Sequence, residues 1–413
     1  MELSDIRLAD KDVFVPGVPH DAFTLLRREA PVHWQDEPDS PGFWAVTRYA
    51  DVIRVSREVE TFSSYERTAL LNESPPLQLE QQRLMMLNMD PPMHTRYRLL
   101  VNKGFTPRMI GRLEEHIRET TTLILDDVIE KGECDFVTSI AAELPLQVIA
   151  ELLGVPHDDR HLVFEWSNRM IGFDDPDYSG SAEAGKLAAV EMYLYANQLA
   201  LARKEHPRDD LVSVLMAGEV DGEKLSEAEF DAFFLILAVA GNETTRNLIS
   251  GGMLALMQHP EERRRLLANP ALLPTAIEEM LRWVTPVMYF RRTATHDTEI
   301  RGQKIHEGEK VTLWYISANR DEEIFPHPDR FDVGRNPNDH LAFGIGHHFC
   351  LGANLARLEI QIIFEELLRR LPDIELAGPV ARLRSNFING IKSMPVRFTP
   401  ERRAGRDDAH PHL

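Results

Sequence analysis

Apolar positions recur along most of the chain with the spacing of helices, and only short stretches alternate as strands do. The first stretch mixes strand-like pieces such as 42–46 with helical ones, and a mostly helical region runs from about Pro91 to Trp283. Beyond it come a strand-like run over 310–315, a coil rich in Pro, Asp and Asn over 321–340, and a last long helix over 352–371. The pattern predicts a mainly α protein with smaller β regions, an α+β chain.

One predicted helix is longer than a small domain is wide. Ser226 and Glu229 form a Ser-x-x-Glu capping box, and helix-compatible residues continue to about His259, where Pro260 stops them. About 33 residues at a rise of 1.5 Å each span roughly 50 Å. Since the helix is apolar nearly all round, we predict that it crosses the centre of the protein.

The middle of this long central helix is polar. It reads Ala240-Gly241-Asn242-Glu243-Thr244-Thr245, where packing alone would favour Leu or Ile. One interpretation is a buried, internally satisfied polar patch or a simple kink. The other is a groove that holds a reactant, opened because the Thr244 hydroxyl bonds back to the Ala240 carbonyl beside Gly241. The residues alone leave both open.

Nothing in the 413 residues separates domains, since no Gly/Ser linker, low-complexity block or repeat is present. We expect a single domain over residues 1–413, with flexible tails at about 1–20 and 400–413. The longest apolar run, Ala232 to Gly241, is well short of the roughly 18 residues that a membrane span needs. The first residues lack the basic and apolar regions of a secretory signal, so we expect a cytoplasmic protein without a membrane span.

Charge and cysteine content narrow the chemistry. A formal net charge of −20 repels nucleic-acid phosphate, so we expect no nucleic-acid partner. The two cysteines, Cys134 and Cys350, are too few for a disulfide framework and too far apart in sequence to resemble paired zinc ligands. Any cysteine chemistry must therefore rest on one thiol.

Cys350 follows a glycine-rich turn and precedes a helix, in the segment Phe343-Gly344-Ile345-Gly346-His347-His348-Phe349-Cys350-Leu351-Gly352. At a helix N-terminus the dipole and free N–H groups are expected to lower a thiol pKa and favour a metal-binding thiolate. The glycines would let backbone approach a flat ligand closely.

Three other interpretations of this segment compete. A Gly-x-Gly phosphate loop would need a preceding strand and a third glycine. A zinc site would use His347 and His348, but the side chains of adjacent histidines generally point apart. A core cysteine in a tight turn stays possible on the residues alone.

The whole segment resembles the haem-ligand loop of cytochromes P450, and other segments match that family in order from about Phe23 to Phe398. The resemblance implies the cytochrome P450 fold with a long central helix and a Cys-ligated haem b. Cys350 would be the axial iron ligand, Phe343 would shield its sulfur, and His348 would reach a haem propionate. The further contacts that it implies in this loop and in the central helix are Gly344, Gly352, Ala240 and Gly241.

Two more segments resemble the parts of the family that hold haem carboxylates. His94 and Arg98 match a His-x-x-x-Arg pair, whose spacing puts both side chains on one helix face. Arg292 matches the arginine that reaches the second propionate, and Arg291 is its out-of-register neighbour. Charged hydrogen bonds to two carboxylates explain why cations are needed there. Without haem, a solvated face would be the default interpretation.

Glu279 and Arg282 resemble the family's Glu-x-x-Arg pair, with Arg330 as the expected third member of the ion-pair network. On its own such an i,i+3 pair says little, because it recurs by chance on solvated helix faces. The implied role is structural, bracing the coil before the Cys350 segment.

The resemblance implies a monooxygenase that inserts one oxygen atom of O2 into a C–H bond, using two electrons and two protons. Glu243 and Thr244 match the family's catalytic acid–alcohol pair. Thr244 would hold the activated oxygen and Glu243 would relay protons from solvent. A peroxide-driven peroxygenase, which typically lacks this pair, and a non-catalytic haem-binding or sensor protein are the alternatives.

Electrons must come from another protein, because the chain has no Gly-x-Gly-x-x-Gly nucleotide site and no iron–sulfur cysteine cluster. We expect NAD(P)H to supply them through a ferredoxin reductase and a ferredoxin, and we expect the chain to be a monomer. Candidate basic residues for ferredoxin docking, which could equally be ordinary solvated cations, are Arg98, Lys103, Arg108 and Arg357.

The substrate is expected to be a small apolar molecule. The segments 86–90, 240–247 and 389–392 look most like the bacterial branch that oxidises steroid side chains and methyl-branched lipids, with terpenoids as the neighbouring possibility. Ordinary core packing is the competing interpretation of the apolar pocket residues that we predict, which are Leu84 to Met89, Trp166 to Ile171, Val239, Val287 to Tyr289 and Phe387-Ile388.

Overall fold

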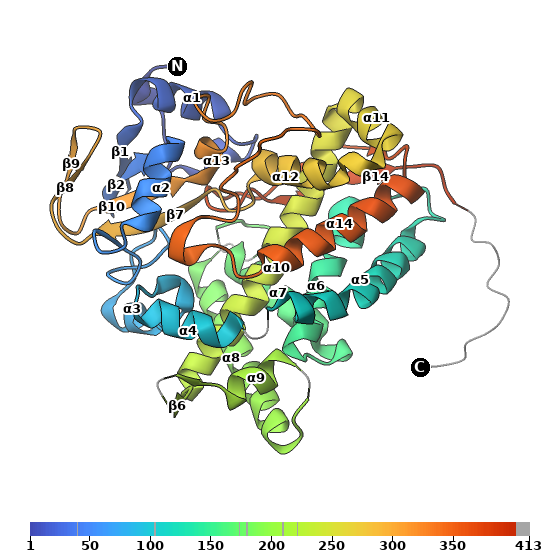
Figure 1. Cartoon of the computed structure of the whole chain (residues 1–413), viewed down its shortest axis with the longest axis horizontal. Coiled ribbons are helices and arrows are strands. Elements are labelled where there is room, and N and C mark those ends of the chain that lie inside the picture. Colours follow the sequence, from blue (N-terminus) through green and yellow to red (C-terminus); the bar gives the residue numbers. More distant parts are fainter. Residues whose placement is uncertain are drawn as a thin grey trace.

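The computed structural model describes residues 1–38, 40–102, 105–172, 174–178, 181–208, 210–220 and 222–401. One helix, α10, crosses the middle of the molecule (Figure 1). The strand-rich part lies to its upper left in that view, and most other helices gather on its remaining sides. Among the described residues, no helix combines the length and the apolar character that a membrane span requires.

The helices of the described residues are α1 (His20–Glu29), α2 (Tyr49–Arg57), α3 (Pro76–Gln82), α4 (Met93–Asn102), α5 (Pro107–Val128), α6 (Glu143–Leu153), α7 (Arg160–Ile171), α8 (Ala182–Glu205), α9 (Leu211–Ala217), α10 (Glu227–Gln258), α11 (Pro260–Ala268), α12 (Leu273–Val284), α13 (Tyr315–Ala318) and α14 (Ala353–Arg370).

The strands are short, and they are β1 (Val32–Glu37), β2 (Ser40–Val46), β3 (Phe62–Ser63), β4 (Glu133–Asp135), β5 (Glu219–Val220), β6 (Glu223–Lys224), β7 (Tyr289–Ala294), β8 (Thr298–Ile300), β9 (Gln303–Ile305), β10 (Lys310–Trp314), β11 (Glu375–Leu376), β12 (Ala381–Arg382), β13 (Ile391–Ser393) and β14 (Pro395–Arg397). The largest sheet has the order β1-β2-β10-β7-β3, with β10 parallel to β2 and antiparallel to β7. The predicted mainly α fold with smaller β regions is confirmed.

The central helix forms as the sequence predicts. Ser226 caps α10, its hydroxyl accepting from the Glu229 N–H at 3.3 Å while Glu229 accepts from the Ser226 N–H at 2.7 Å. The helix runs for 32 residues and ends at His259, where Pro260 opens α11.

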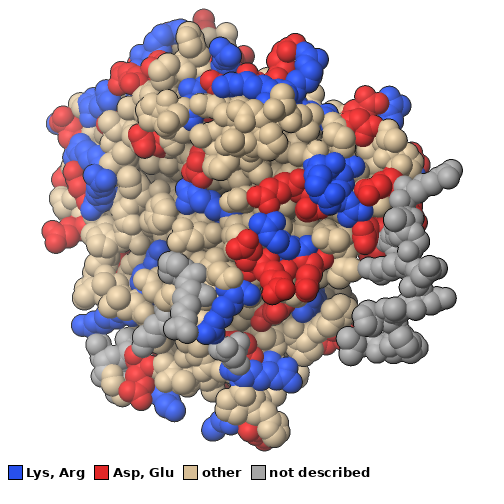
Figure 2. Space-filling model, turned by 45° about the vertical axis from the view of Figure 1, so that its right-hand side comes forward, with Lys and Arg blue, Asp and Glu red and all other residues tan. Residues whose placement is uncertain are grey.

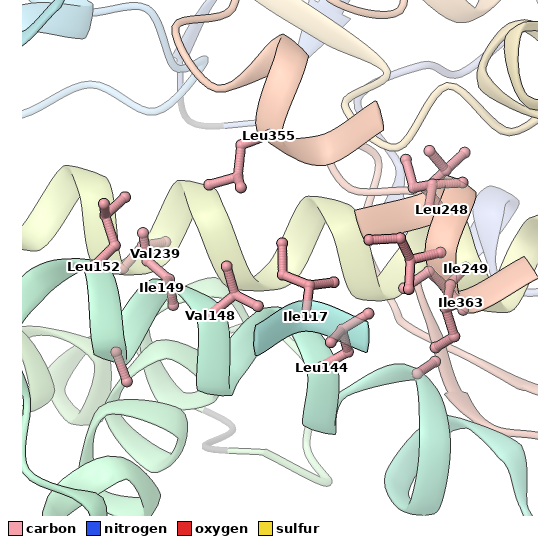
Figure 3. Close-up of a cluster of buried hydrophobic side chains, with 14 of the residues drawn as sticks. Ile117, Leu144, Val148, Ile149, Leu152, Val239, Leu248, Ile249, Leu355 and Ile363 are labelled. Carbon is pink, nitrogen blue, oxygen red and sulfur yellow. The ribbon is translucent and has the colours of Figure 1, made fainter. Parts of the chain in front are cut away.

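Helix α10 is buried because other helices pack on several of its sides. Figure 3 shows side chains of α6, among them Val148 and Ile149, packed against α10, with Leu355 of α14 approaching from the opposite side. At the closest approach to α6, a Cβ on Gly241 would lie 2.8 Å from Ile149 Cδ1. Glycine is therefore required there for the two helices to touch.

The first residues correct the expectation of a flexible tail over 1–20. Ile6, Leu8 and Phe14 are buried in an apolar cluster with Trp314, and the Phe14 and Trp314 rings stack with centroids 6.2 Å apart. The Leu8 carbonyl accepts from Asn386 Nδ2 at 2.9 Å. Buried apolar area and satisfied backbone hold this segment in place. At the other end, residues 402–413 of the expected tail lie outside the described residues.

Glu279 is the centre of a buried network that holds the irregular coil between α13 and α14. Its carboxylate accepts from Arg282 Nε and Nη2, both at 2.8 Å, and from Arg335 Nε at 3.0 Å. Arg282 also donates to the carbonyls of Asn319 and Pro328, both at 2.9 Å. The coil thus gains the hydrogen bonds that a helix or sheet would otherwise supply.

Arg335, not Arg330, is the third member of this network, which corrects the sequence prediction. The Arg330 side chain is 65% exposed, and its nearest carboxylate is Glu262 at 3.7 Å. Only the Arg330 carbonyl joins the network, accepting from Arg335 Nη2 at 2.8 Å.

Replacing Glu279 by Ala should lower the free energy of unfolding by about 3–5 kcal/mol, because it leaves buried arginines without their anion. Urea unfolding followed by circular dichroism measures this change. The control is Glu366→Ala, which breaks a surface pair with Arg369, whose side chain is 64% exposed, and should cost less than about 1 kcal/mol. Equal losses in the two variants would contradict the central role of Glu279.

Candidate functional site

The Cys350 loop has the turn geometry that its glycines predict. Gly344 and Gly346 have φ of 69° and 76°, a region that residues with a Cβ avoid. A Cβ on Gly346 would also lie 3.0 Å from the Ser56 carbonyl oxygen. The Cys350 N–H donates to the Phe343 carbonyl at 2.9 Å and closes the loop, and α14 begins at Ala353 after its N-cap, Gly352.

Burial raises the pKa of the Cys350 thiol, against the opposing effects of the Gly352 N–H, Arg98 and Arg357. The sequence-based expectation of a lowered pKa is therefore wrong for the thiol by itself, because desolvation outweighs the helix terminus and the nearby cations. A metal ion would deprotonate such a thiol on binding, whatever its pKa without the metal. The loop thus provides one buried sulfur with two arginines close enough to stabilise its thiolate.

A half-buried carboxylate ties the Cys350 loop to two helices. Glu278 of α12 accepts from Arg357 of α14 at 2.7 and 2.8 Å and lies 3.0 Å from His340 Nε2. The Arg357 guanidinium in turn lies 4.6 Å from the centre of the Phe343 ring. This arrangement holds Phe343, the side chain that the resemblance places over the sulfur, and no sequence signal marked Glu278 or His340.

Four cationic or potentially cationic side chains gather close to the Cys350 loop, and they are His94, Arg98, Arg292 and His348. The rings of His94 and His348 are 4.3 Å apart. Burial, followed by the charges of Arg98, His347 and Arg292, lowers the pKa of His94 to about 4. The pKa of His348 is also well below its usual value, first through burial and then through the neighbouring cations.

This cluster has no anion of its own. Within the described part of the chain, none of the four lies within 4.0 Å of a carboxylate, and the buried His94 Nδ1 has no hydrogen-bond partner. Buried cations without counter-charges are costly, so the donor set suits a ligand that brings carboxylates. The two propionates of a haem fit that description.

Strand β7 explains why Arg292 and not Arg291 joins the cluster. Successive side chains of a strand point to opposite faces. Arg291 turns to Glu73 at 3.0 Å and to the Leu71 carbonyl at 3.1 Å. The Arg292 guanidinium is buried on the other face, within electrostatic reach of His94 and His348. The structure thus places Arg292, and not Arg291, beside the two histidines, and its contact with a propionate stays a prediction.

The middle of α10 borders solvent-accessible space at Ala240, which we call the hollow. The Thr244 hydroxyl donates to the Ala240 carbonyl at 2.8 Å, as predicted. Ala240 is exposed although Ala238, Val239 and Asn242 around it are buried. The packing of Gly241 on Ile149 explains that glycine, so Ala240 is the residue of the pair that faces open space.

The polar patch beside this hollow does not satisfy its own hydrogen bonds. Buried Glu243 pairs with buried Arg246, which also donates to the half-buried Asn168 Oδ1 at 2.8 Å. Glu243 Oε1 and both polar atoms of the Asn242 amide have no partner among the described residues. Burial raises the pKa of Glu243 despite Arg246. Because these polar atoms have no partner, the middle of α10 is better interpreted as a groove that holds a reactant or water than as an internally satisfied polar patch.

Comparison with known proteins decides the family, since the cytochrome P450 sequence profile matches residues 44–372. The chain belongs to the cytochrome P450 family. It is 45% identical over 399 residues to a steroid C26-monooxygenase of Rhodococcus jostii, covering 94% of this chain and 84% of the relative. It is 43% identical over 410 residues to a methyl-branched lipid omega-hydroxylase of Mycobacterium bovis, covering 96% and 95%.

Solved structures agree. A Mycobacterium marinum cytochrome P450 in complex with pseudoionone has a TM-score of 0.88 and 41% identity, covering 95% of this chain and 98% of its own. The protein is therefore a P450 monooxygenase, an oxidoreductase that incorporates oxygen, and its family uses haem iron, O2 and electrons from redox partners.

The predicted pocket residues of this P450 fall into two groups. Met86, Met89, Trp166 and Val239 lie in the apolar cluster around α10, together with Met85, Met170 and Ile171. Met288 and Tyr289 instead lie in the N-terminal cluster, where the Tyr289 ring is 4.7 Å from that of Trp314. They are core residues, which corrects their prediction as pocket residues.

The predicted docking cations also need revision. Arg357 is held by Glu278, and Arg98 is half-buried beside Cys350. Lys103 and the side chain of Arg108 lie outside the described residues. Arg57 was not predicted from the sequence. Its side chain is exposed beside the Cys350 loop, where a Cβ on Gly346 would lie 3.7 Å from Arg57 Cγ. No sequence signal marked Arg57, since only folding brings α2 to the Cys350 loop.

The pH dependence of stability should reveal the Glu278 brace. Its pKa is lowered from 4.5 to about 2 by Arg357 and His340, which outweigh burial. The brace therefore stabilises the fold fully above about pH 4.5, and this contribution is lost as the pH falls toward 2. Glu278→Gln should cost about 1–2 kcal/mol at pH 6, after allowing for solvent screening, and less at pH 3. Urea unfolding at both pH values measures the difference, and a constant gap would contradict it.

Proposed function

We propose that this P450 hydroxylates the hydrocarbon chain of a steroid or a methyl-branched lipid. The observation that carries the proposal is one partly buried thiol close to two arginines and two histidines that have no carboxylate partner, with an acid–alcohol pair on α10. The relatives named above support the substrate class, and the apolar cluster around α10 supports an apolar substrate. A terpenoid is the neighbouring possibility.

In this proposal the resident cofactor is haem b, with Cys350 as the iron ligand. His94, Arg98, Arg292 and His348 hold its two propionates, and Phe343 keeps water from the sulfur. Ala240 leaves room along α10, while Gly344 and Gly352 let the backbone of the loop approach. When bound, thiolate-ligated haem supplies the activation of dioxygen and the cleavage of its O–O bond.

The catalytic residues of the proposal are Thr244 and Glu243. Thr244 can keep its bond to the Ala240 carbonyl and still accept a hydrogen bond in the hollow, so it can orient a water or a reactant there. Glu243 keeps one oxygen on Arg246 and one free. The free oxygen can pass protons from the wet groove to the Thr244 hydroxyl. A peroxide-driven enzyme would not need this pair.

Electrons are proposed to come from NAD(P)H through a separate reductase and ferredoxin, in the cytoplasm, to a monomer. Despite the net charge of −20, basic and acidic clusters alternate on the face in Figure 2. Local basic groups can therefore steer an acidic partner. Arg57, exposed beside the Cys350 loop, has no carboxylate within 4.0 Å among the residues described and is our first candidate for docking.

The cysteine assignment has a spectral test. The reduced protein with carbon monoxide should absorb at the long wavelength typical of thiolate ligation, and Cys350→His should move that band to shorter wavelength. Cys134→Ser should leave the band unchanged, because Cys134 lies in strand β4, which pairs with β14, and burial raises its pKa to about 11. Retention of the original band in Cys350→Ala would overturn the assignment.

The acid and the alcohol should fail in different ways. Thr244→Ala should lower the product formed per O2 consumed, because protons are no longer delivered at the right place and reduced oxygen escapes as peroxide. Glu243→Gln should slow O2 consumption itself, roughly 10- to 100-fold, because the relay is lost while the hydroxyl stays. Oxygen-electrode rates and product yields with the tightest-binding steroid or branched lipid measure both. Equal coupling in wild type and Thr244→Ala would remove Thr244 from the mechanism.

A further inference from the structure

A second pocket, of about 240 Å³, lies apart from the residues described above. It forms where the C-terminal part of α10 meets the end of α12, the start of α1 and the segment 382–391. This volume is below the roughly 300–1,000 Å³ of sites for drug-sized ligands, so a small molecule is the fitting occupant. Its lining residues are Gly17, Val18, His20, Gly251, Leu254, Ala255, Gln258, Trp283, Val284, Arg320, Arg382, Asn389 and Ile391.

One wall of this second pocket carries buried nitrogen atoms without partners. His20 Nδ1 and Arg320 Nε are both buried and make no hydrogen bond within the described residues. The Arg320 residue is only 5% exposed, and its guanidinium lies 3.9 Å from the centre of the Trp283 ring. The Arg320 Nε–H is a donor that calls for an acceptor, and so is His20 Nδ1 in the tautomer that carries its proton there.

The charge around this wall is positive. Arg27, Arg282, Arg320 and Arg382 all act to lower the pKa of His20, after burial, which is the larger cause. Three of these arginines have carboxylate partners, which are Glu322 for Arg27 at 2.9 Å, Glu279 for Arg282 at 2.8 Å and Asp329 for Arg320 at 2.9 Å.

Arg382 is the cation left over. In the described part of the chain no carboxylate lies within 4.0 Å of Arg382, and its guanidinium donates only a long hydrogen bond of 3.5 Å to Asn389 Oδ1. Burial lowers its pKa without an opposing anion. A half-buried arginine with its fork unpaired is the side chain best suited to bind a carboxylate or a phosphate.

The remaining lining of the pocket is largely apolar and does not repel an anion. It includes Val18, Leu254, Ala255, Val284 and Ile391. The C-terminus of α10 carries partial negative charge, but the Ala255 carbonyl already accepts from the His259 N–H at 3.0 Å and lies 2.8 Å from His259 Nδ1. A ligand with an anionic end and a short apolar end would match both parts of the lining.

We propose that this pocket binds a small organic anion, whose carboxylate or phosphate oxygens lie against Arg382, Arg320 and His20 and whose apolar part lies on α10. The site is separate from the one that holds Cys350, Glu243 and Thr244, because none of these residues lines it.

The occupant would brace a segment that borders the proposed substrate site, and this consequence rests on the proposed function. Asn389 donates to the carbonyls of Val284 at 2.6 Å and Pro286 at 2.9 Å. Val287 and Ile388 form a β-bridge one residue further on. An anion held by Arg382, which itself donates to Asn389 Oδ1, would therefore steady the neighbouring Ile388, one of the predicted pocket residues.

Calorimetric titration of the haem-loaded protein with inorganic phosphate and, separately, with hexanoate tests the proposal at constant ionic strength. Binding of phosphate alone, hexanoate alone or both supports the site and identifies the anion. Arg382→Gln should weaken that binding at least about tenfold, whereas Arg382→Lys should lose less because the charge stays. The control is Arg397→Gln, which removes the same charge from a side chain that is 64% exposed, and should change binding less than about twofold.

Haem absorption, recorded during the same titrations, separates this site from the substrate site. An anion in the second pocket should leave the haem spectrum of the substrate-free protein unchanged, and it should shift the affinity of a steroid or lipid measured afterwards. No heat with either anion, equal binding in Arg382→Gln, or a haem shift caused by hexanoate itself would overturn the proposal. Because calorimetry needs no turnover, these outcomes do not depend on whether the proposed substrate is correct.

Discussion

The position of Cys350 depends on one buried carboxylate more than on any helix or strand. The coil before the Cys350 loop has little regular structure, so its shape must come from side chains. Glu279 binds Arg282 and Arg335, and these two arginines donate to backbone carbonyls along the coil. A buried ion pair of this kind is a poor source of stability but a good source of a single conformation. This network therefore holds the backbone of the coil that leads to the Cys350 loop.

The site itself is built from charges that the fold leaves unpaired. His94 and His348 are held neutral by burial and by each other's cationic neighbours, and Arg292 is buried without a carboxylate. Burying these groups costs free energy in the absence of an anion. Two carboxylates that paired with them would offset that cost. With haem bound by these residues as proposed, its binding and the folding of this region would be coupled, as metal binding and folding are in other proteins.

Much of this could be predicted from the sequence, and the parts that could not share one cause. The α10 boundaries, the Cys350 turn, the Arg292 register and the bond from Thr244 to Ala240 are local, set by caps, glycine and period. The errors are long-range. Arg335, and not the predicted Arg330, binds Glu279. Met288 and Tyr289 pack in the N-terminal core with Phe14 and do not line the pocket. In both cases tertiary packing decides between residues of the same chemistry. The raised pKa of Cys350 likewise reflects burial, which no single sequence displays.

The length of α10 links the core to the chemistry. A helix that crosses the whole molecule can be anchored at both ends by packing, so its middle can carry groups that destabilise it. Gly241 packs closely on Ile149 of α6. Ala240, the preceding residue, faces the hollow. The strain of burying Glu243 and Asn242 with unmet hydrogen bonds is thus borne by apolar contacts many residues away. A shorter helix with the same polar middle would be unstable, because fewer apolar turns would remain to offset the cost of the unmet hydrogen bonds.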